Sequence, residues 1–122
     1  MKSLAPLVVL TAILLALPAQ AQRAVTLQAR TAADLADLCA ANPKESQGDA
    51  KINFCHGFAQ GAITVELRRA GDKKPFCFPT PAPTRTATMG EFVNWVRSLP
   101  EHRTETAVDG LFKFLGERFP CK

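Results

Sequence analysis

The segment FCHGFAQG, residues 54–61, places a cysteine next to a histidine, a pair that suggests a thiol nucleophile or two metal ligands. A nucleophilic cysteine needs a base within hydrogen-bond reach. Successive helix residues point about 100° apart, so Cys55 and His56 cannot face each other within a helix. The second histidine, His102, is isolated, and the sequence lacks the CxxC and HxxxH spacings typical of zinc sites. We therefore expect no catalytic residue, no metal site, no cofactor and no enzymatic activity.

The first 21 residues have the composition of a secretory signal peptide. Lys2 provides a positive start, an uncharged apolar stretch follows, and the small residues Ala19 and Ala21 form a cleavage site. The apolar stretch is too short to span a bilayer comfortably and has no basic stop after it. We predict a signal peptide over residues 1–21, cleaved after Ala21, and a periplasmic protein without a membrane anchor.

Cleavage would leave residues 22–122, which are 101 of the 122 residues and enough for one domain. Without Lys2, the 15 basic residues become 14 against 11 acidic ones, which gives a net charge of +3. This charge is too small and too scattered to indicate a nucleic-acid partner. We expect a flexible segment over residues 22–30 and a folded domain over residues 31–122.

Apolar residues at helical spacing predict four helices and no strand. The first helix begins at Thr31, which forms a weak capping box with Asp34. The second covers residues 49–70, ends at Gly71 and has an apolar face broad enough for a central helix. The predicted fold class is therefore all-α, a small four-helix domain stapled by disulfides.

The two later helices follow a proline-rich loop that Phe76 and Phe78 are expected to pin. The third helix is predicted to begin at a capping box of Thr88 and Glu91 and to end before Pro100. The fourth is predicted over roughly residues 104–118. The side chains expected to point inward from these two helices are Phe92, Val93, Val96, Leu99, Ala107, Val108, Leu111, Phe112, Leu115 and Phe119.

The four cysteines, Cys39, Cys55, Cys77 and Cys121, are typical of a disulfide framework in a small exported chain. An antiparallel hairpin of the first two helices brings Cys39 close to Cys55. Cys77 precedes the third helix and Cys121 follows the fourth, so a second hairpin brings these two together. We predict the pairs Cys39–Cys55 and Cys77–Cys121, because a Cys55–Cys77 bond would have to span roughly 20 Å of helix.

Gly57 and Gly61 lie within the second predicted helix, where each glycine costs about 1 kcal/mol relative to alanine. A close approach of another backbone would offset that cost. We expect the two glycines to serve helix packing, either within the chain or between two subunits. His56 lies beside the buried stripe and is interpreted as structural.

Five motifs in order, TAADLADLC, FCHGFAQGA, PFCFP, VNWVRSLPEHR and RFPC, resemble the Rap/Tai-type immunity proteins of type VI secretion systems. The resemblance covers residues 31–121. It implies a small, periplasmic, mostly helical fold that is often dimeric. It also implies tight binding to a toxic peptidoglycan amidase, whose active site the immunity protein occludes without performing chemistry itself. The cysteines and glycines match as positions that define the fold, not as binding residues.

Two segments have the character of loops that plug a cleft. RSLPEHRTE, residues 97–105, is charged at its tip and joins the last two predicted helices, where the resemblance implies a binding loop. PTPAPTRT, residues 79–86, is extended in advance and costs little entropy to order on binding. Both can also be interpreted as ordinary solvated connectors, and Trp95 as either an interface hot spot or part of the core rim. The candidate partner-binding residues are Trp95, Arg97, Glu101, His102 and Arg103.

The sequence therefore predicts a periplasmic immunity-type binding protein that neutralises a peptidoglycan amidase toxin, with a homodimer as a further expected assembly. The alternative is a non-enzymatic periplasmic helical protein with an envelope or stress function and no toxin partner. An enzyme with Cys55 or Cys77 as its nucleophile is a third hypothesis. Resistance of the folded protein to thiol alkylation would remove that third hypothesis.

Overall fold

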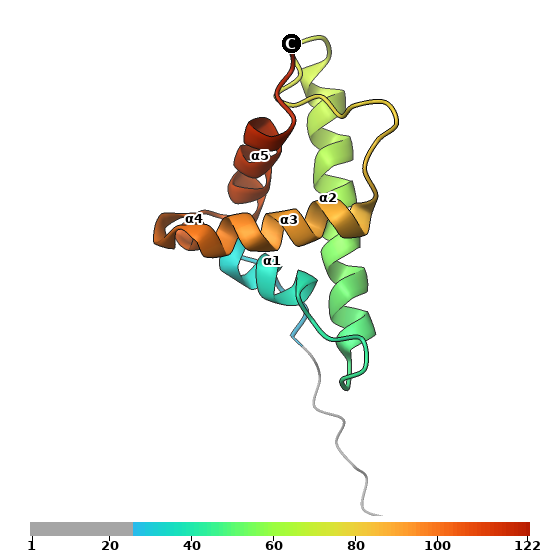
Figure 1. Ribbon diagram of the computed structural model, residues 1–122, viewed down its shortest axis with the longest axis vertical. Helices are drawn as coiled ribbons and strands as arrows, with labels where there is room; N and C mark the ends of the chain where they lie inside the picture. The colour runs from blue at the N-terminus through green and yellow to red at the C-terminus, as the bar shows by residue number, and fades with distance from the viewer. Residues whose placement is uncertain (1–25) are drawn as a thin grey trace, which may run out of the picture.

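The computed structural model describes residues 26–122, which fold into helices without a strand (Figure 1). The five helices are α1 (Ala32–Cys39), α2 (Gly48–Ala70), α3 (Arg85–Ser98), α4 (Pro100–Thr104) and α5 (Ala107–Arg118). This confirms the predicted all-α fold stapled by disulfides. The short helix α4 is not predicted from the sequence. The predicted signal peptide, and residues 22–25 of the segment after it, lie outside the described residues.

The short helix α1 occupies the centre of the fold. Thr31 caps it as predicted: its hydroxyl accepts from the N–H of Asp34, and the Asp34 carboxylate accepts from the N–H of Thr31, each at 3.1 Å. The helix contacts α2, α3, α4 and α5. Its buried side chains are Ala32, Leu35, Ala36 and Leu38. So short a helix is marginal by itself, and its stability comes from this packing.

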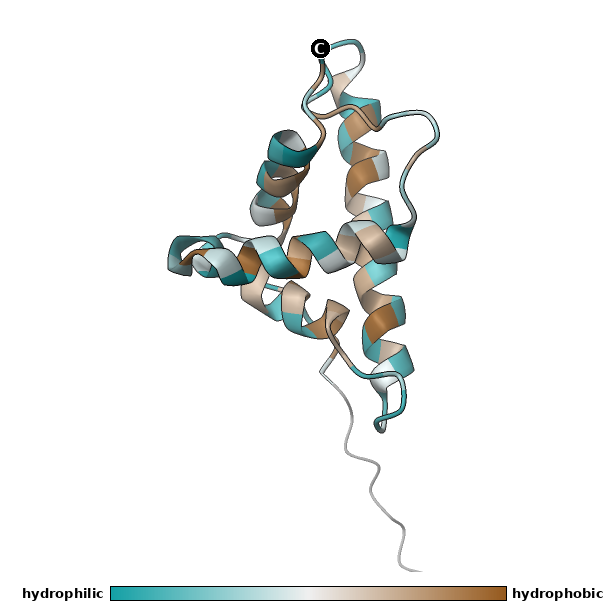
Figure 2. Ribbon diagram, in the orientation of Figure 1, coloured by the Kyte–Doolittle hydropathy of each residue, from teal (hydrophilic) through white to brown (hydrophobic). Residues whose placement is uncertain are grey.

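Helix α2 runs along one flank of the molecule and is not the central helix that its apolar face predicts (Figure 1). Of its 23 residues, Gly48, Cys55 and Ala59 are buried. Figure 2 shows apolar segments distributed along its whole length. The reason is size: α2 is about 34 Å long and α1 about 12 Å, so α1 covers only part of the apolar face of α2.

The hydrophobic core lies mainly between α1, α3 and α5. Phe92 of α3 and Phe114 of α5 meet edge to face, with ring centroids 5.6 Å apart. The prediction for α5 is partly wrong, because Phe114 is buried while Val108 is exposed. The buried residues of α5 are Ala107, Gly110, Leu111, Phe114 and Leu115, and Val108 lies in the first turn at the edge of this face.

Helix α3 begins four residues earlier than predicted. Thr84 caps it, with its hydroxyl accepting from the N–H of Ala87 at 3.1 Å. Thr88, the predicted cap, is buried in the first turn and donates its hydroxyl to the Thr84 carbonyl at 3.0 Å. The helix starts as soon as the chain has passed Pro83, because no later residue interrupts the backbone hydrogen bonds.

Two disulfides join Cys39 to Cys55 and Cys77 to Cys121, with Cα–Cα distances of 5.1 Å and 4.9 Å. The structure confirms the predicted pairing. The first bond ties the end of α1 to α2, and the second ties the loop after α2 to the end of the chain. Phe76, next to Cys77, is fully buried, so this loop is pinned as predicted.

Candidate partner-binding site

The chain turns sharply between α3 and α4, and a proline causes the turn. Pro100 occupies the first turn of α4, where a helix tolerates proline. A residue before proline avoids the helical region, and Leu99 is extended, with φ −137° and ψ 138°. Helix α3 therefore ends at Ser98, and α4 forms a corner with it. We call residues 97–103 the α3–α4 corner.

A stack of Trp95 on His102 holds the α3–α4 corner together from within. The ring centroids are 3.6 Å apart and the ring planes differ by 8°. The Nδ1–H of His102 donates to the Trp95 carbonyl oxygen at 2.7 Å, and the Ser98 hydroxyl donates to the same oxygen. The geometry assigns a proton to Nδ1, because a carbonyl oxygen only accepts. The indole N–H of Trp95 donates to the Glu117 carboxylate at 2.7 Å, which anchors the stack to α5.

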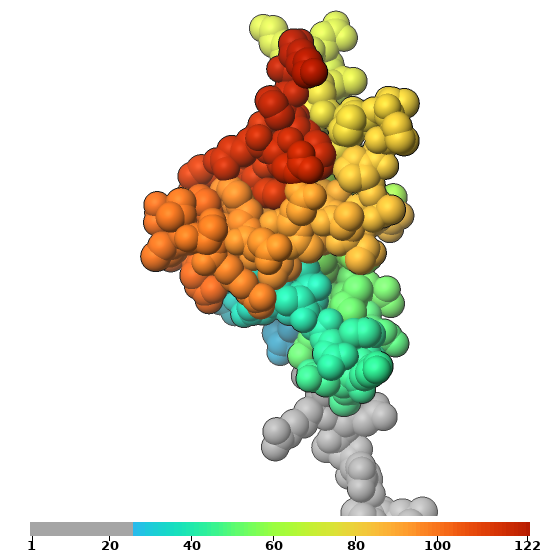
Figure 3. All heavy atoms as spheres, in the orientation of Figure 1, coloured from blue at the N-terminus to red at the C-terminus, as the bar shows by residue number. Residues whose placement is uncertain are grey.

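The candidate partner-binding residues divide into two groups in the structure. His102 is buried, with 6 % of its surface exposed, and Trp95 is half-buried. These two side chains position α4 and present little surface to a partner. Arg97, Glu101 and Arg103 are exposed. Figure 3 shows the α3–α4 corner, drawn in orange, projecting from the side of the molecule.

Leu99 is the residue of this site that sequence reasoning missed. Its spacing places it in the buried stripe of α3, but 45 % of its surface is exposed. Because Pro100 ends the helix at Ser98, the Leu99 side chain leaves that stripe and turns outward. The position directly before a proline was the signal that could have shown this.

The charged side chains of the corner are free to pair with a partner. Within the described residues, none of Arg97, Glu101 and Arg103 takes part in a salt bridge. The corner therefore carries two cations and one carboxylate, all exposed, within four residues of Leu99 in the sequence. Rim charges govern orientation and association rate more than affinity.

The second candidate segment, residues 79–86, is divided by the start of α3. Residues 79–84 form an irregular connector, which we call the proline strap, whereas Arg85 and Thr86 belong to the helix. The strap bends at residues 80 and 81 and is not the continuously extended segment that its prolines predict. The strap is mostly exposed, with only Pro83 half-buried. The structure therefore brings together the parts of the α3–α4 corner but leaves the strap as a separate feature at the other end of α3.

The expectation that Gly57 and Gly61 serve packing within the chain is wrong. A methyl group built on either residue would meet no atom within 4 Å. The close helix contact lies instead at Gly110 of α5, where a methyl group would approach the Cβ of Ala32 to 2.7 Å. Packing between subunits, the other alternative for Gly57 and Gly61, stays a prediction.

The FCHGFAQG segment has a structural role in the folded protein. Cys55 and Cys77 each belong to a disulfide, so neither sulfur is a thiolate nucleophile. In the part of the chain that the structure describes, no group of three or more His, Cys, Asp or Glu side chains could hold a metal ion. Nor does any helix within residues 26–122 have the length and apolar character to cross a membrane. Fold and disulfides together define a disulfide-stapled helical domain.

Comparison with known families shows which family this domain belongs to. The family model described as Rap1a immunity proteins matches residues 31–121, and the chain belongs to this family. Membership implies a toxin-immunity function with a protein toxin as the partner, and immunity proteins are generally not enzymes. Together with the two disulfides, it indicates a location outside the cytoplasm. Comparisons with curated proteins and with solved structures find no match.

Proposed function

We propose that this protein neutralises a peptidoglycan amidase toxin by occluding the active site of the toxin with the α3–α4 corner. The observation that carries the proposal is the projecting corner (Figure 3), which includes Leu99 with 45 % of its surface exposed. An enzyme that cleaves a polymer holds its substrate in a cleft, and a convex element fits a cleft. The corner presents a convex, partly apolar surface of this kind.

The contacts that order the α3–α4 corner from within favour tight binding. Each flexible side chain that is immobilised on association costs about 0.5–1.5 kcal/mol. The stack of Trp95 on His102, and the hydrogen bond to Glu117, order the corner before a partner arrives. Leu99 then supplies an apolar anchor, and its charged neighbours supply the polar rim that is typical of interfaces.

The proposal is tested by the hydrolysis of purified peptidoglycan by amidase toxins encoded next to this gene, with and without the mature protein. We expect the wild-type protein to abolish hydrolysis at a one-to-one ratio. Leu99→Glu places a charge at the anchor, so it should weaken inhibition by about tenfold or more. Val108→Glu is the matched control, because Val108 is an apolar residue on α5 with a similar exposed fraction, 39 %.

Two results would count against this proposal. Undiminished hydrolysis by every such amidase at excess protein would exclude the amidase as the partner. Equal loss of inhibition in Leu99→Glu and Val108→Glu would exclude the α3–α4 corner as the binding surface.

A second variant tests whether His102 positions the α3–α4 corner or contacts the toxin directly. His102→Ala removes the stack and the hydrogen bond to the Trp95 carbonyl. We expect weaker inhibition together with a smaller near-ultraviolet circular dichroism signal, which reports on Trp95, the single tryptophan of the chain. The far-ultraviolet signal should be unchanged. Lost inhibition with an unchanged tryptophan signal would instead assign His102 a direct contact.

We place the protein in the periplasm, where a type VI secretion system of a neighbouring cell would deliver such a toxin. The composition of residues 1–21 and the two disulfides support this location. Sequencing of the protein from a periplasmic extract is expected to find Gln22 as the first residue. Recovery of a chain that begins at Met1, from the cytoplasm alone, would contradict this.

We assign the outer face of α2 to a homodimer. Val65 on this helix is 66 % exposed, and Gly57 and Gly61 leave room for a second backbone. Small residues let two helices approach closely. Sedimentation equilibrium is expected to show a dimer that Val65→Lys dissociates and Val108→Lys leaves intact. A wild-type protein that is monomeric at high micromolar concentration would rule this assembly out.

A further inference from the structure

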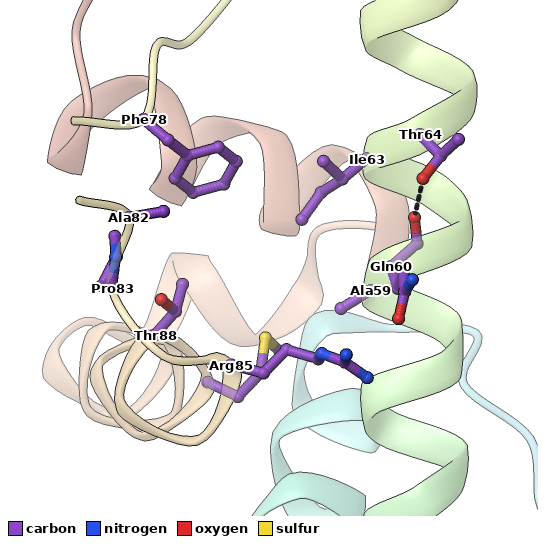
Figure 4. Close-up of a pocket in the computed structure, with 10 residues that line it drawn as sticks. Ala59, Gln60, Ile63, Thr64, Phe78, Ala82, Pro83, Arg85 and Thr88 are labelled. Carbon is purple, nitrogen blue, oxygen red and sulfur yellow. Dashed lines mark hydrogen bonds between the residues drawn. The ribbon is translucent and has the colours of Figure 1, made fainter. Parts of the chain in front are cut away.

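A groove lies between α2, the proline strap and the start of α3 (Figure 4). Its volume is about 370 Å³, within the range of roughly 300–1,000 Å³ that is typical of small-molecule sites. The apolar residues that line it are Ala59, Ile63, Phe78, Ala82, Pro83 and Met89. The groove lies at the opposite end of α3 from the α3–α4 corner, so it is a second surface feature and not part of the proposed toxin site.

Small residues and a stiff strap keep this groove open. Ala59 and Met89 are buried at its base, and the side chains of Phe78 and Ile63 point into the opening (Figure 4). The three prolines of the strap restrict its backbone, which bends at residues 80 and 81. In the described chain, no backbone hydrogen bond outside the helices joins residues 78–83 to the body of the protein. The strap therefore stands off from α2 and leaves the groove unfilled.

Two polar side chains at the groove have N–H groups that donate to no acceptor in the described part of the chain. The hydroxyls of Thr64 and Thr88 are already engaged, because they donate to backbone carbonyls at 2.7 Å and 3.0 Å. In contrast, the Arg85 guanidinium and the side-chain amide of Gln60 have no hydrogen-bond or ion-pair partner within the described residues. Figure 4 shows the Arg85 side chain reaching toward α2 near Gln60. No acidic side chain is among the described residues that line the groove.

We infer that this groove binds a small amphipathic carboxylate of the fatty-acid type. Its carboxylate would accept from Arg85 and Gln60, since a charge-assisted hydrogen bond is the strongest contact that an unpaired guanidinium can make. Its unbranched aliphatic chain would lie along Ile63, Phe78 and Met89, where burial contributes about 25 cal/mol per Å² of apolar surface.

The strap disfavours a peptide as the occupant. A bound peptide needs partners for its own N–H and C=O groups. The strap prolines at positions 79, 81 and 83 have no N–H to donate, and the bend at residues 80 and 81 interrupts the regular backbone that an added strand would need. An aliphatic chain has no such requirement.

The probe for this inference is decanoate, titrated into the mature protein below the concentration at which it forms micelles. We expect saturable binding to one site by calorimetry. In nuclear magnetic resonance spectra, the largest shift changes are expected at Ile63, Phe78 and Met89. The absence of saturable binding, or shift changes centred elsewhere, would overturn the inference.

Substitutions separate the contribution of the Arg85 charge to ligand binding from that of the apolar groove. Arg85→Gln is expected to weaken decanoate binding about tenfold while leaving the weaker binding of decanol unchanged. Arg97→Gln removes the same charge at the other end of α3 and should change the binding of neither decanoate nor decanol. Ala82→Trp, at an exposed strap position, fills the groove and should abolish binding of both ligands.

Decanoate binding that survives Ala82→Trp would show that the ligand lies elsewhere and would overturn the site. Decanol bound as tightly as decanoate would overturn the pairing with Arg85. Thermal unfolding of each variant verifies that the fold is intact. If Ala82→Trp does not fold, the comparison of Arg85→Gln with Arg97→Gln still decides the inference.

Discussion

Gly110 shows how a single missing methyl group sets the distance between two helices. The starts of α1 and α5 lie side by side, where the N–H of Ala32 donates to the Glu105 carbonyl and the N–H of Ala107 donates to the Arg30 carbonyl, each at 2.9 Å. A Cβ on Gly110 would lie 2.7 Å from the Cβ of Ala32. Neither helix can move away without breaking those hydrogen bonds. Glycine at this position therefore permits the central contact of the fold.

Gly110→Ala is expected to lower the free energy of unfolding by about 1–3 kcal/mol, the usual cost of forcing a methyl group into a packed site. Gly90→Ala on α3 is the matched control. A methyl group there meets nothing within 4 Å, so the better helix propensity of alanine should raise the free energy of unfolding by up to about 1 kcal/mol. Urea unfolding of both variants measures the difference. Equal stability of the two variants would contradict the close contact assigned to Gly110.

At the scale of elements, capping and prolines decide where each helix begins and ends. Asp34 caps α1 by accepting from the N–H groups of Thr31 and Arg30, each at 3.1 Å. These backbone hydrogen bonds hold the pKa of the Asp34 carboxyl below its ordinary value. Because α1 is the central helix, loss of its cap affects the packing of every other helix.

The lowered pKa of Asp34 makes part of the stability dependent on pH. The carboxylate is favoured in the folded state, so its contribution is fully present above the unfolded pKa and is lost as the pH falls through the lower, folded pKa. In Asp34→Asn this contribution is absent at every pH. We expect the wild type to melt at a higher temperature than Asp34→Asn at neutral pH, and the difference to shrink below about pH 4.

Asp37→Asn, which removes the same charge from the same helix, controls for net charge in this experiment. Thermal melting between neutral and strongly acidic pH measures all three proteins. A difference between the wild type and Asp34→Asn that stays constant throughout acidification would show that the carboxylate hydrogen bonds do not contribute as described.

At the scale of the whole molecule, two disulfides hold together helices that share a small core. The loops they close span 16 and 44 residues of sequence separation. On the chain-entropy model, cross-links of these lengths contribute about 3 and about 4 kcal/mol. A domain of this size has a total stability of about 5–15 kcal/mol. The covalent bonds therefore supply a large share of what keeps the binding surface rigid.

Replacing both cysteines of each pair by alanine should reveal these contributions separately. We expect Cys77→Ala with Cys121→Ala to lower the free energy of unfolding more than Cys39→Ala with Cys55→Ala, because it opens the longer loop. Urea unfolding under oxidising conditions measures both. If the wild type and the variant without any disulfide had the same transition midpoint, the disulfides would not stabilise the fold.

Much of the fold follows from short-range patterns in the sequence, because capping, helix periodicity and proline geometry act over a few residues. The cap at Thr31, the end of α2 at Gly71 and the end of α3 before Pro100 are determined in this way. The disulfide pairing also follows, since two hairpins leave one short-range solution. The turn of Leu99 to the surface has the same local cause, although periodicity alone hides it.

The tertiary structure decided what depends on distant neighbours. It placed α1 at the centre and α2 on a flank, because relative helix lengths determine which apolar faces are covered. It brought Trp95 onto His102, and it located the close helix contact at Gly110 and not at Gly57 or Gly61. A sequence states which residues are apolar, small or charged. Which of them meet depends on how the whole chain packs: Pro100 sets the local turn, but only packing places Trp95 against His102 and Glu117 and so fixes residues 97–103 as a projecting corner.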